Sequence, residues 1–166
     1  GGFINGIVMK KNQPLHGFIQ GDPVGARWSL FKTTNGGVNW DSAGMYLPQA
    51  GSEAGWNNSI FIASQSLYTE ADSLLWFGTN NTKVYHSTNF GTTWTAQSTA
   101  PEVNSYALGF LYFGEGNGLA GGTTLMKTSN YGINWTSQTS VGTGNFSGFV
   151  LFPAPVDYGY SWYTRN

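Results

Sequence analysis

The sequence contains no cysteine, which excludes disulfides, thiolate metal sites and a cysteine nucleophile. Charged residues make up only 9% of the 166 residues, and the formal net charge is -1. This charge gives no electrostatic reason to expect nucleic acid or an anionic membrane as a partner. No apolar run approaches the roughly 20 residues that span a bilayer. The chain begins at Gly1 without an initiating Met or a basic-then-apolar leader, so we expect a mature or partial product.

Aromatic residues and glycine are abundant by contrast. Aromatics reach 16% of the chain, and there are 24 glycines. High glycine with little charge favours many short strands joined by tight turns, and argues against both a helical bundle and a disordered tail. The best window for a helix, residues 65–75, lacks a sustained 3.6-residue apolar stripe. The composition therefore predicts an all-β chain.

One eight-residue motif occurs three times, in the form hydroxyl, any, Asn, any, Gly, any, any, Trp. Its fixed positions are Thr33, Asn35, Gly37 and Trp40; Ser87, Asn89, Gly91 and Trp94; and Thr128, Asn130, Gly132 and Trp135. Each copy follows an alternating run that is typical of a strand. The Asn side chain can bond to backbone N–H groups just ahead of it, and Gly can take a positive φ. The Trp opens a return strand and can fold over the turn, so the motif predicts a hairpin.

The motif resembles the Asp-box, or BNR repeat, of sialidases and many other secreted β-propellers, whose usual form is Ser-x-Asp-x-Gly-x-x-Trp. Here Asn replaces Asp in all three copies, which keeps the acceptor and removes the charge. The resemblance implies a sialidase-like propeller fold, with each box between the third and fourth strands of a blade at the outer rim. It also implies a secreted or cell-surface location. The Asn variants are similar to repeats in surface proteins of Bacteroidetes-like bacteria.

The spacing of the motifs predicts the blades. Trp40 and Trp94 are 54 residues apart, and Trp94 and Trp135 are 41 apart. These intervals bracket one four-stranded blade of roughly 40 to 50 residues. We predict blade units at 1–44, 57–98 and 104–140 and a partial unit at 145–166, about three and a half antiparallel blades of a larger propeller. Completion by another copy or another protein is the alternative.

Within the first unit, the Gly21-Asp22-Pro23 stretch predicts a break between the second and third strands, and Trp40 is expected to begin the fourth.

Some aromatic residues are candidates for binding, because sugar rings stack on flat aromatic faces. Trp56 lies in a predicted loop, and Trp162 lies near Tyr158 and Tyr160; these four are the candidate binding residues. Trp28 and Trp76 lie in alternating strands and are expected in the core. The three motif tryptophans are expected to pack at the rim.

The sequence offers no convergent catalytic set. Sialidases with this box bind the substrate carboxylate through three arginines, and this chain has only Arg27 and Arg165. Other glycosidases need two carboxylates about 5 to 9.5 Å apart. The carboxylates considered, all predicted to be solvated turn residues, are Asp22, Glu102, Glu115 and Asp157. We predict no catalytic residue in this segment.

The two histidines, His16 and His86, lack further ligands at matched spacing, so we predict no metal site and no cofactor. His86 is expected to pack or to meet water.

The sequence favours a non-catalytic extracellular or cell-surface propeller module. Its partners would be a protein or carbohydrate at a surface, together with the rest of the propeller or another subunit. The alternative is part of a glycoside hydrolase, sialidase-like or xyloglucanase-like, whose catalytic residues lie partly outside this segment. A third hypothesis is an assembly factor resembling those of photosystem II, which share the box. Such factors are expected to carry a basic patch, whereas the five Lys and two Arg here are scattered.

Overall fold

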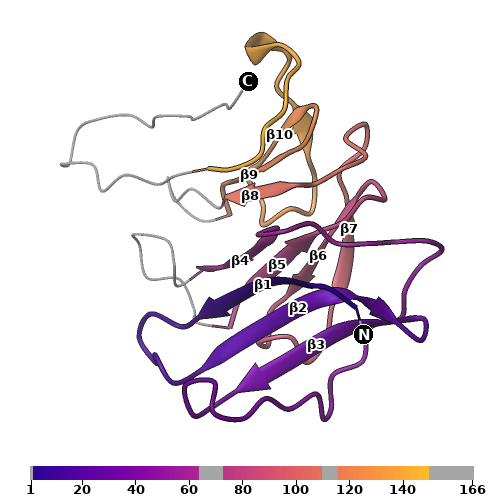
Figure 1. Cartoon of the computed structure of the whole chain (residues 1–166). Coiled ribbons are helices and arrows are strands. Elements are labelled where there is room, and N and C mark those ends of the chain that lie inside the picture. The colour runs from indigo at the N-terminus through magenta and orange to yellow at the C-terminus, as the bar shows by residue number, and fades with distance from the viewer. Residues whose placement is uncertain (1, 64–72, 110–115, 150–166) are drawn as a thin grey trace.

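Three antiparallel sheets follow one another along the chain. The computed structural model describes residues 2–63, 73–109 and 116–149. Within each sheet the strands lie in sequence order. The strands are β1 (Ile4–Met9), β2 (Gly17–Val24) and β3 (Arg27–Thr33); β4 (Ile60–Ile62), β5 (Leu75–Gly78), β6 (Lys83–Ser87) and β7 (Thr95–Ser98); and β8 (Ala107–Gly109), β9 (Gly118–Gly121), β10 (Leu125–Thr128) and β11 (Thr136–Ser137). Figure 1 shows the three sheets stacked in chain order.

The prediction of an all-β chain of successive antiparallel sheets is confirmed. The described ranges contain a short 3-10 turn, η2 (Thr139–Val141), and no helix there has the length and apolar character to cross a membrane. The β3 and β6 strands begin and end where the alternating runs before the first two motifs predict them. The predicted start of a further unit after residue 149 lies outside the described residues.

The predicted break at Gly21-Asp22-Pro23 is wrong, because β2 continues through these residues to Val24. The hairpin turn instead lies at Gly25 and Ala26, which both have φ of 61°. Two successive left-handed residues suit a two-residue hairpin. Pro23 is tolerated because the pairing of β2 with β3 shifts register between Gly21 and Val24, so Pro23 lies at an irregularity where no ladder hydrogen bond is lost.

The predicted fourth strand at Trp40 is also wrong. The first sheet has three strands, and the segment after Trp40 makes only an isolated bridge between Lys32 and Asp41. A tight turn ends the pairing there: Asp41 Oδ1 accepts the Ala43 N–H at 2.8 Å, and Gly44 has φ of 70°. The chain then returns to the edge of β3, where Arg27 bridges Pro48.

Large apolar side chains fill the space between the first and second sheets. The buried residues of this core are Val8, Phe18, Trp28, Leu30, Met45, Leu47, Ile60, Ile62, Leu75, Phe77 and Tyr85. The Trp28 ring lies 4.8 Å from Phe77 and 6.0 Å from Tyr85, measured between ring centroids. Trp28 is 3% exposed, as predicted for a core residue.

A second core joins the second and third sheets. It contains Phe61, Ala63, Trp76, Val84, Leu108, Ala120 and Met126. Successive strand residues point to opposite faces. The second sheet therefore contributes Phe77 to one core and Trp76 to the other. Trp76 is 1% exposed, so its predicted core position is also confirmed.

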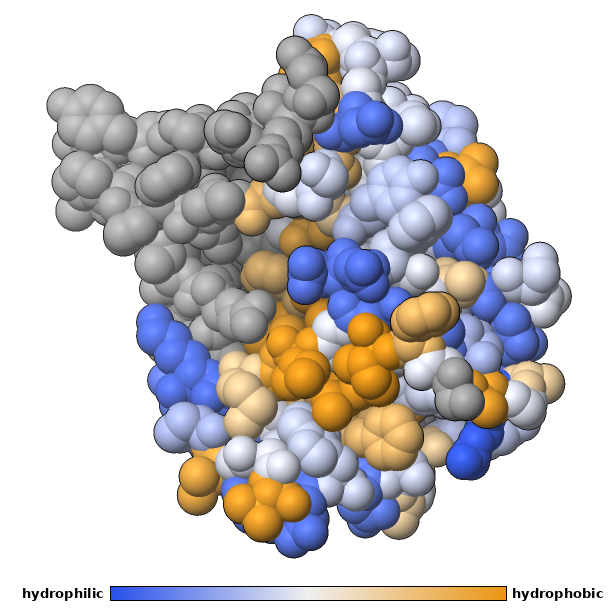
Figure 2. Space-filling model, in the orientation of Figure 1, coloured by the Kyte–Doolittle hydropathy of each residue, from blue (hydrophilic) through white to orange (hydrophobic). Residues whose placement is uncertain are grey.

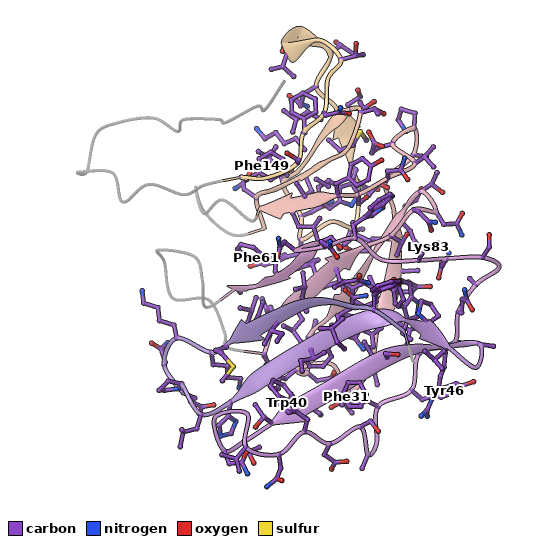
Figure 3. The ribbon with its side chains drawn as sticks, viewed as in Figure 1. Phe31, Trp40, Tyr46, Phe61, Lys83 and Phe149 are labelled. Atoms are coloured by element: carbon purple, nitrogen blue, oxygen red, sulfur yellow. The ribbon has the colours of Figure 1, made fainter. Side chains whose placement is uncertain are left out.

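The outer face of the first sheet carries an apolar row. Ile7 pairs with Ile19, and Ile19 with Phe31, so the three side chains share the face opposite to Val8 and Trp28. Ile7 is 57% exposed. Figure 2 shows apolar residues gathered over this sheet, and Figure 3 labels Phe31. In the second sheet the matching row, Ile60, Phe77 and Tyr85, is covered by the first sheet.

Candidate functional site

The three motifs form three turns with the same hydrogen bonds. In the second copy, Ser87 Oγ accepts the N–H groups of Asn89 and Gly91 at 3.3 and 2.8 Å. The Ser87 hydroxyl donates to Asn89 Oδ1 at 3.0 Å, and the same oxygen accepts the Thr93 N–H at 2.8 Å. The first and third copies repeat these four bonds. The motif side chains thus satisfy the backbone groups of the turn.

Each turn is also tied to its own sheet. The residue directly before the motif glycine has a positive φ. Its N–H donates to a carbonyl that lies two residues before the second strand of the same sheet. The pairs are Gly36 to Leu15, Phe90 to Ser73 and Tyr131 to Gly116, at 2.8, 2.8 and 2.9 Å. The hydrogen bonds place all three turns at equivalent positions.

The second and third turns pack against the preceding sheet. The Phe90 and Trp94 rings lie 5.9 and 5.7 Å from the Phe18 ring of the first sheet. In the third turn, the Tyr131 carbonyl accepts bonds from Trp76 Nε1 at 3.3 Å and Gln97 Nε2 at 2.9 Å. Both side chains belong to the second sheet. The motifs therefore join neighbouring sheets, which is an architectural role.

His86 packs against an aromatic neighbour in its own sheet. Its ring stacks on Trp76, with the centroids 4.5 Å apart and the planes 2° from parallel. Burial lowers the pKa of His86 from 6.5 to about 4, so the imidazole is neutral at pH 7. Across the described residues, no three side chains of His, Asp or Glu are grouped to hold a metal ion.

A buried glutamate lies in each connection between sheets. Glu53, whose side chain is fully buried, pairs with Lys83 Nζ at 2.7 Å and accepts the Tyr85 hydroxyl at 2.8 Å. It also accepts bonds from Asn81 Nδ2 and the Ala50 N–H at 3.3 and 3.2 Å. Burial alone would raise the pKa of Glu53, but these partners lower it below its ordinary value of 4.5.

Glu102 occupies the matching place between the second and third sheets, so its prediction as a solvated turn residue is wrong. It is 1% exposed. Its Oε1 accepts the Asn104 N–H at 2.8 Å, and its Oε2 accepts the Thr123 hydroxyl and the Thr124 N–H. Thr123 and Thr124 belong to the β9–β10 hairpin of the third sheet. Sequence alone could not show this, because these partners are 21 and 22 residues away.

A cavity of about 770 Å³ lies at the shared end of the sheets where their first strands begin. Its lining comes from the start of β1, the end of β2, and the connections that lead into β4, into β8 and beyond η2. The lining residues are Phe3, Asn5, Asp22, Gly55, Trp56, Asn57, Tyr106, Asn145 and Ser147. Because β1 packs beside β4, and β4 beside β8, three successive sheets meet here.

Asp22 is held at the edge of this cavity and is half-buried, so its prediction as a solvated turn carboxylate is wrong too. Its Oδ1 accepts Asn5 Nδ2 at 2.8 Å and the Gly55 N–H at 2.9 Å. A Cβ at Gly55 would lie 2.3 Å from Asn5 Nδ2, so only glycine permits this approach. The Ser29 hydroxyl donates to the Asp22 carbonyl at 2.7 Å.

Trp56 is the predicted binding residue that the structure places in the cavity. It lies at a turn in which buried Ser59 donates its hydroxyl and its N–H to the Trp56 carbonyl, at 2.9 and 3.1 Å. Its ring meets Tyr106 edge to face, with centroids 4.3 Å apart. Trp56 Nε1 is buried and has no hydrogen-bond partner in the described part of the chain. The ring atoms that Trp56 presents to the cavity are therefore carbons.

The other predicted binding residues, Tyr158, Tyr160 and Trp162, lie outside the described residues, as do Glu115 and Asp157. Sequence reasoning missed the roles of Phe3, Asn5 and Tyr106. A signal was available: Phe3 and Tyr106 each immediately precede the first strand of a sheet, so equivalent positions in the repeat place them at the same end.

Comparison with known proteins supports the fold. No family model matches this chain, and no curated protein matches it. Among solved structures it is similar to YCF48 from Cyanidioschyzon merolae, with a TM-score of 0.54 and 20% identity over 82% of this chain and 37% of that one. It is also similar to a GH74 enzyme of Niastella koreensis, with a TM-score of 0.55 and 15% identity over 82% of this chain and 22% of that one.

A third similar structure is YCF48 bound to D1 peptide, with a TM-score of 0.52 and 17% identity over 82% of this chain and 40% of that one. The chain thus spans between about a fifth and two fifths of these proteins. At these identities the likeness concerns the fold alone. The stacked antiparallel sheets, with these similar structures, show a β-propeller fold in which the described sheets are successive blades.

Proposed function

We propose that this chain is a non-catalytic binding module, whose ligand site is the cavity at the shared end of the three sheets. The observation that carries the proposal is the meeting of Trp56 and Tyr106, from two different connections, over a cavity that also holds Asp22. Pockets of this kind, with apolar walls and a few fixed polar groups, are typical of ligand sites. The similar structure of YCF48 with D1 peptide supports a protein as partner.

The proposal includes location and wider partners. The low charge and the secreted propellers that the motif resembles support an extracellular or cell-surface module of bacterial origin. The apolar row of Ile7, Ile19 and Phe31 on the outer face of the first sheet, in which Ile7 is 57% exposed, supports contact with the rest of the propeller or with another subunit. The proposed ligand is a protein or a glycan at a surface.

Binding of peptide and glycan arrays by the labelled chain tests this function. We expect Trp56→Ala to lose the ligands that the original chain retains, because the indole supplies the cavity's apolar wall. Tyr46→Ala is the matched control: Tyr46, labelled in Figure 3, is 65% exposed in a loop and is not one of the residues that line the cavity. Equal retention by the Trp56→Ala variant would refute the proposal.

A second candidate is part of a glycoside hydrolase, which the likeness to GH74 enzymes favours. Hydrolysis needs two facing carboxylates. Among the described lining residues, Asp22 is the one carboxylate, so a second would have to come from elsewhere. Release of sugar from a xyloglucan or a fluorogenic sialoside, abolished in Asp22→Asn, would support this candidate. Turnover unchanged by that substitution would exclude Asp22 from the reaction.

A further inference from the structure

We infer that the cavity receives a cationic side chain, lysine or arginine, of a partner polypeptide. The inference rests on the proposed binding function and names the chemistry of the ligand. It is carried by the combination of one carboxylate and three aromatic residues around one cavity: Asp22, Phe3, Trp56 and Tyr106.

The charge of the cavity decides between ligand classes. Asp22 is the only charged residue among the described lining residues; the others are aromatic, amide, hydroxyl or glycine. Its Oδ1 is occupied by Asn5 and Gly55, which fix the carboxylate in position. Its Oδ2 accepts no hydrogen bond within the described ranges and is left to a ligand. An anionic ligand would face this charge without a compensating cation, and so would bind poorly.

The aromatic residues supply the second half of a cation site. A Lys or Arg group over the face of a Trp, Tyr or Phe ring is attracted by the ring's electrons. Phe3 is 79% exposed at the cavity, and Trp56 presents ring carbons because its Nε1 is buried. The edge-to-face contact at 71° between Trp56 and Tyr106 holds the two rings at an angle, so they bound the cavity as two walls.

The remaining lining fits a polypeptide around that side chain. Asn57, Asn145 and Ser147 offer uncharged donors and acceptors that suit backbone amides. A volume of about 770 Å³ exceeds that of one side chain, so neighbouring backbone can enter with it. A neutral sugar could also use the rings and amides, but it would gain nothing from the Asp22 charge. The charge therefore favours the basic side chain.

The test compares two acetylated and amidated peptides, Gly-Ser-Lys-Ser-Gly and its norleucine counterpart, by isothermal titration calorimetry with the full chain. Norleucine keeps the apolar stem of lysine and lacks the ammonium. We expect the lysine peptide to bind at least about tenfold tighter, a factor that corresponds to roughly 1.4 kcal/mol. Asp22→Asn should remove that difference, because the amide still accepts from Asn5 and Gly55 and carries no charge.

Asp41→Asn is the matched control, since Asp41 is an exposed turn carboxylate outside the cavity that accepts the Ala43 N–H. It should leave the preference for lysine unchanged. Circular dichroism checks that each variant is folded. If Asp22→Asn does not fold, salt titration of the unsubstituted chain decides: binding of the lysine peptide should weaken with salt while that of the norleucine peptide should not.

Three results would overturn the inference: no lysine-peptide binding, equal binding of both peptides, or a lysine preference that survives Asp22→Asn. The last would place the cation elsewhere. A further outcome is a ligand, such as a neutral oligosaccharide, that binds the original chain and the Asp22→Asn variant equally well and fails to bind the Trp56→Ala variant. That result would refute the cation site and leave the binding function intact. Failure of Trp56→Ala to affect any ligand would refute the binding function itself.

Discussion

Replacing Glu53 by glutamine is expected to destabilise the junction between the first and second sheets. The substitution keeps the shape of the side chain and removes its charge. It also turns one carboxylate oxygen into an amide donor, which must then face donors. Lys83 and Asn81 surround one oxygen of Glu53, and Tyr85 and the Ala50 N–H surround the other, so neither orientation of the amide satisfies all four.

The magnitude follows from burial. The Glu53 side chain is 0% exposed, and Lys83 is 21% exposed. Removing one partner of a buried pair costs about 3 to 5 kcal/mol. Lys83 can recover some hydration, so we expect the free energy of unfolding to fall by about 3 kcal/mol at pH 7. The pKa of Glu53 is lower in the folded chain than its ordinary 4.5. The contribution is therefore present above pH 4.5 and is lost as the pH falls through the folded pKa.

Urea unfolding followed by circular dichroism measures this change, with Asp41→Asn as the control. Asp41 is exposed and its carboxylate accepts a single backbone N–H, so its substitution should change the free energy by less than about 0.5 kcal/mol. The double variant Glu53→Gln with Lys83→Met should lose less than the two single losses added together, because the pair is coupled. A Glu53→Gln variant as stable as the control at pH 7 would refute the reasoning.

Three further predictions concern the turns and His86. Between pH 7 and 5 His86 becomes protonated in the unfolded chain but stays neutral in the folded chain, where its pKa is about 4. The free energy of unfolding should therefore fall by about 1.5 kcal/mol over this range, and His86→Phe should abolish this dependence in acid titrations. Gly91→Ala should lower the free energy of unfolding by about 3 kcal/mol or more, because the new Cβ would lie 2.1 Å from Phe18. Gly25→Ala should lower it by only about 1 kcal/mol, because a Cβ there has open space and only the φ of 61° opposes it. Equal melting temperatures of the two variants would contradict this. Asn89→Ala should cost about 1 to 2 kcal/mol in urea unfolding, because it removes the acceptor of two bonds, and a neutral effect would contradict the role of that oxygen.

The turns could be predicted from the sequence because their partners lie within a few residues of one another. Ser87 and Asn89 reach only as far as Thr93, so the motif contains its whole hydrogen-bond set. The alternating runs before the motifs predict β3 and β6 for the same reason. The all-β architecture follows from these local units repeated along the chain.

The rest depended on contacts between distant segments. Trp56 and Tyr106 are brought together by the docking of the second and third sheets, which no local pattern encodes. Pro23 within β2 breaks a local rule and is tolerated because the pairing of β2 with β3 is irregular between Gly21 and Val24. The fourth strand after Trp40 was expected by analogy with the other copies, and the Asp41 turn prevents it.

Gly36 gives the first turn a different edge from the other two. Its counterparts, Phe90 and Tyr131, pack with their rings against the sheet before them, whereas Gly36 has no side chain and a Cβ there would meet Leu15 at 3.3 Å. A sheet that covers Ile7 and Phe31 would therefore meet the aliphatic Leu15, which is 58% exposed, at the place where the other two turns present an aromatic ring.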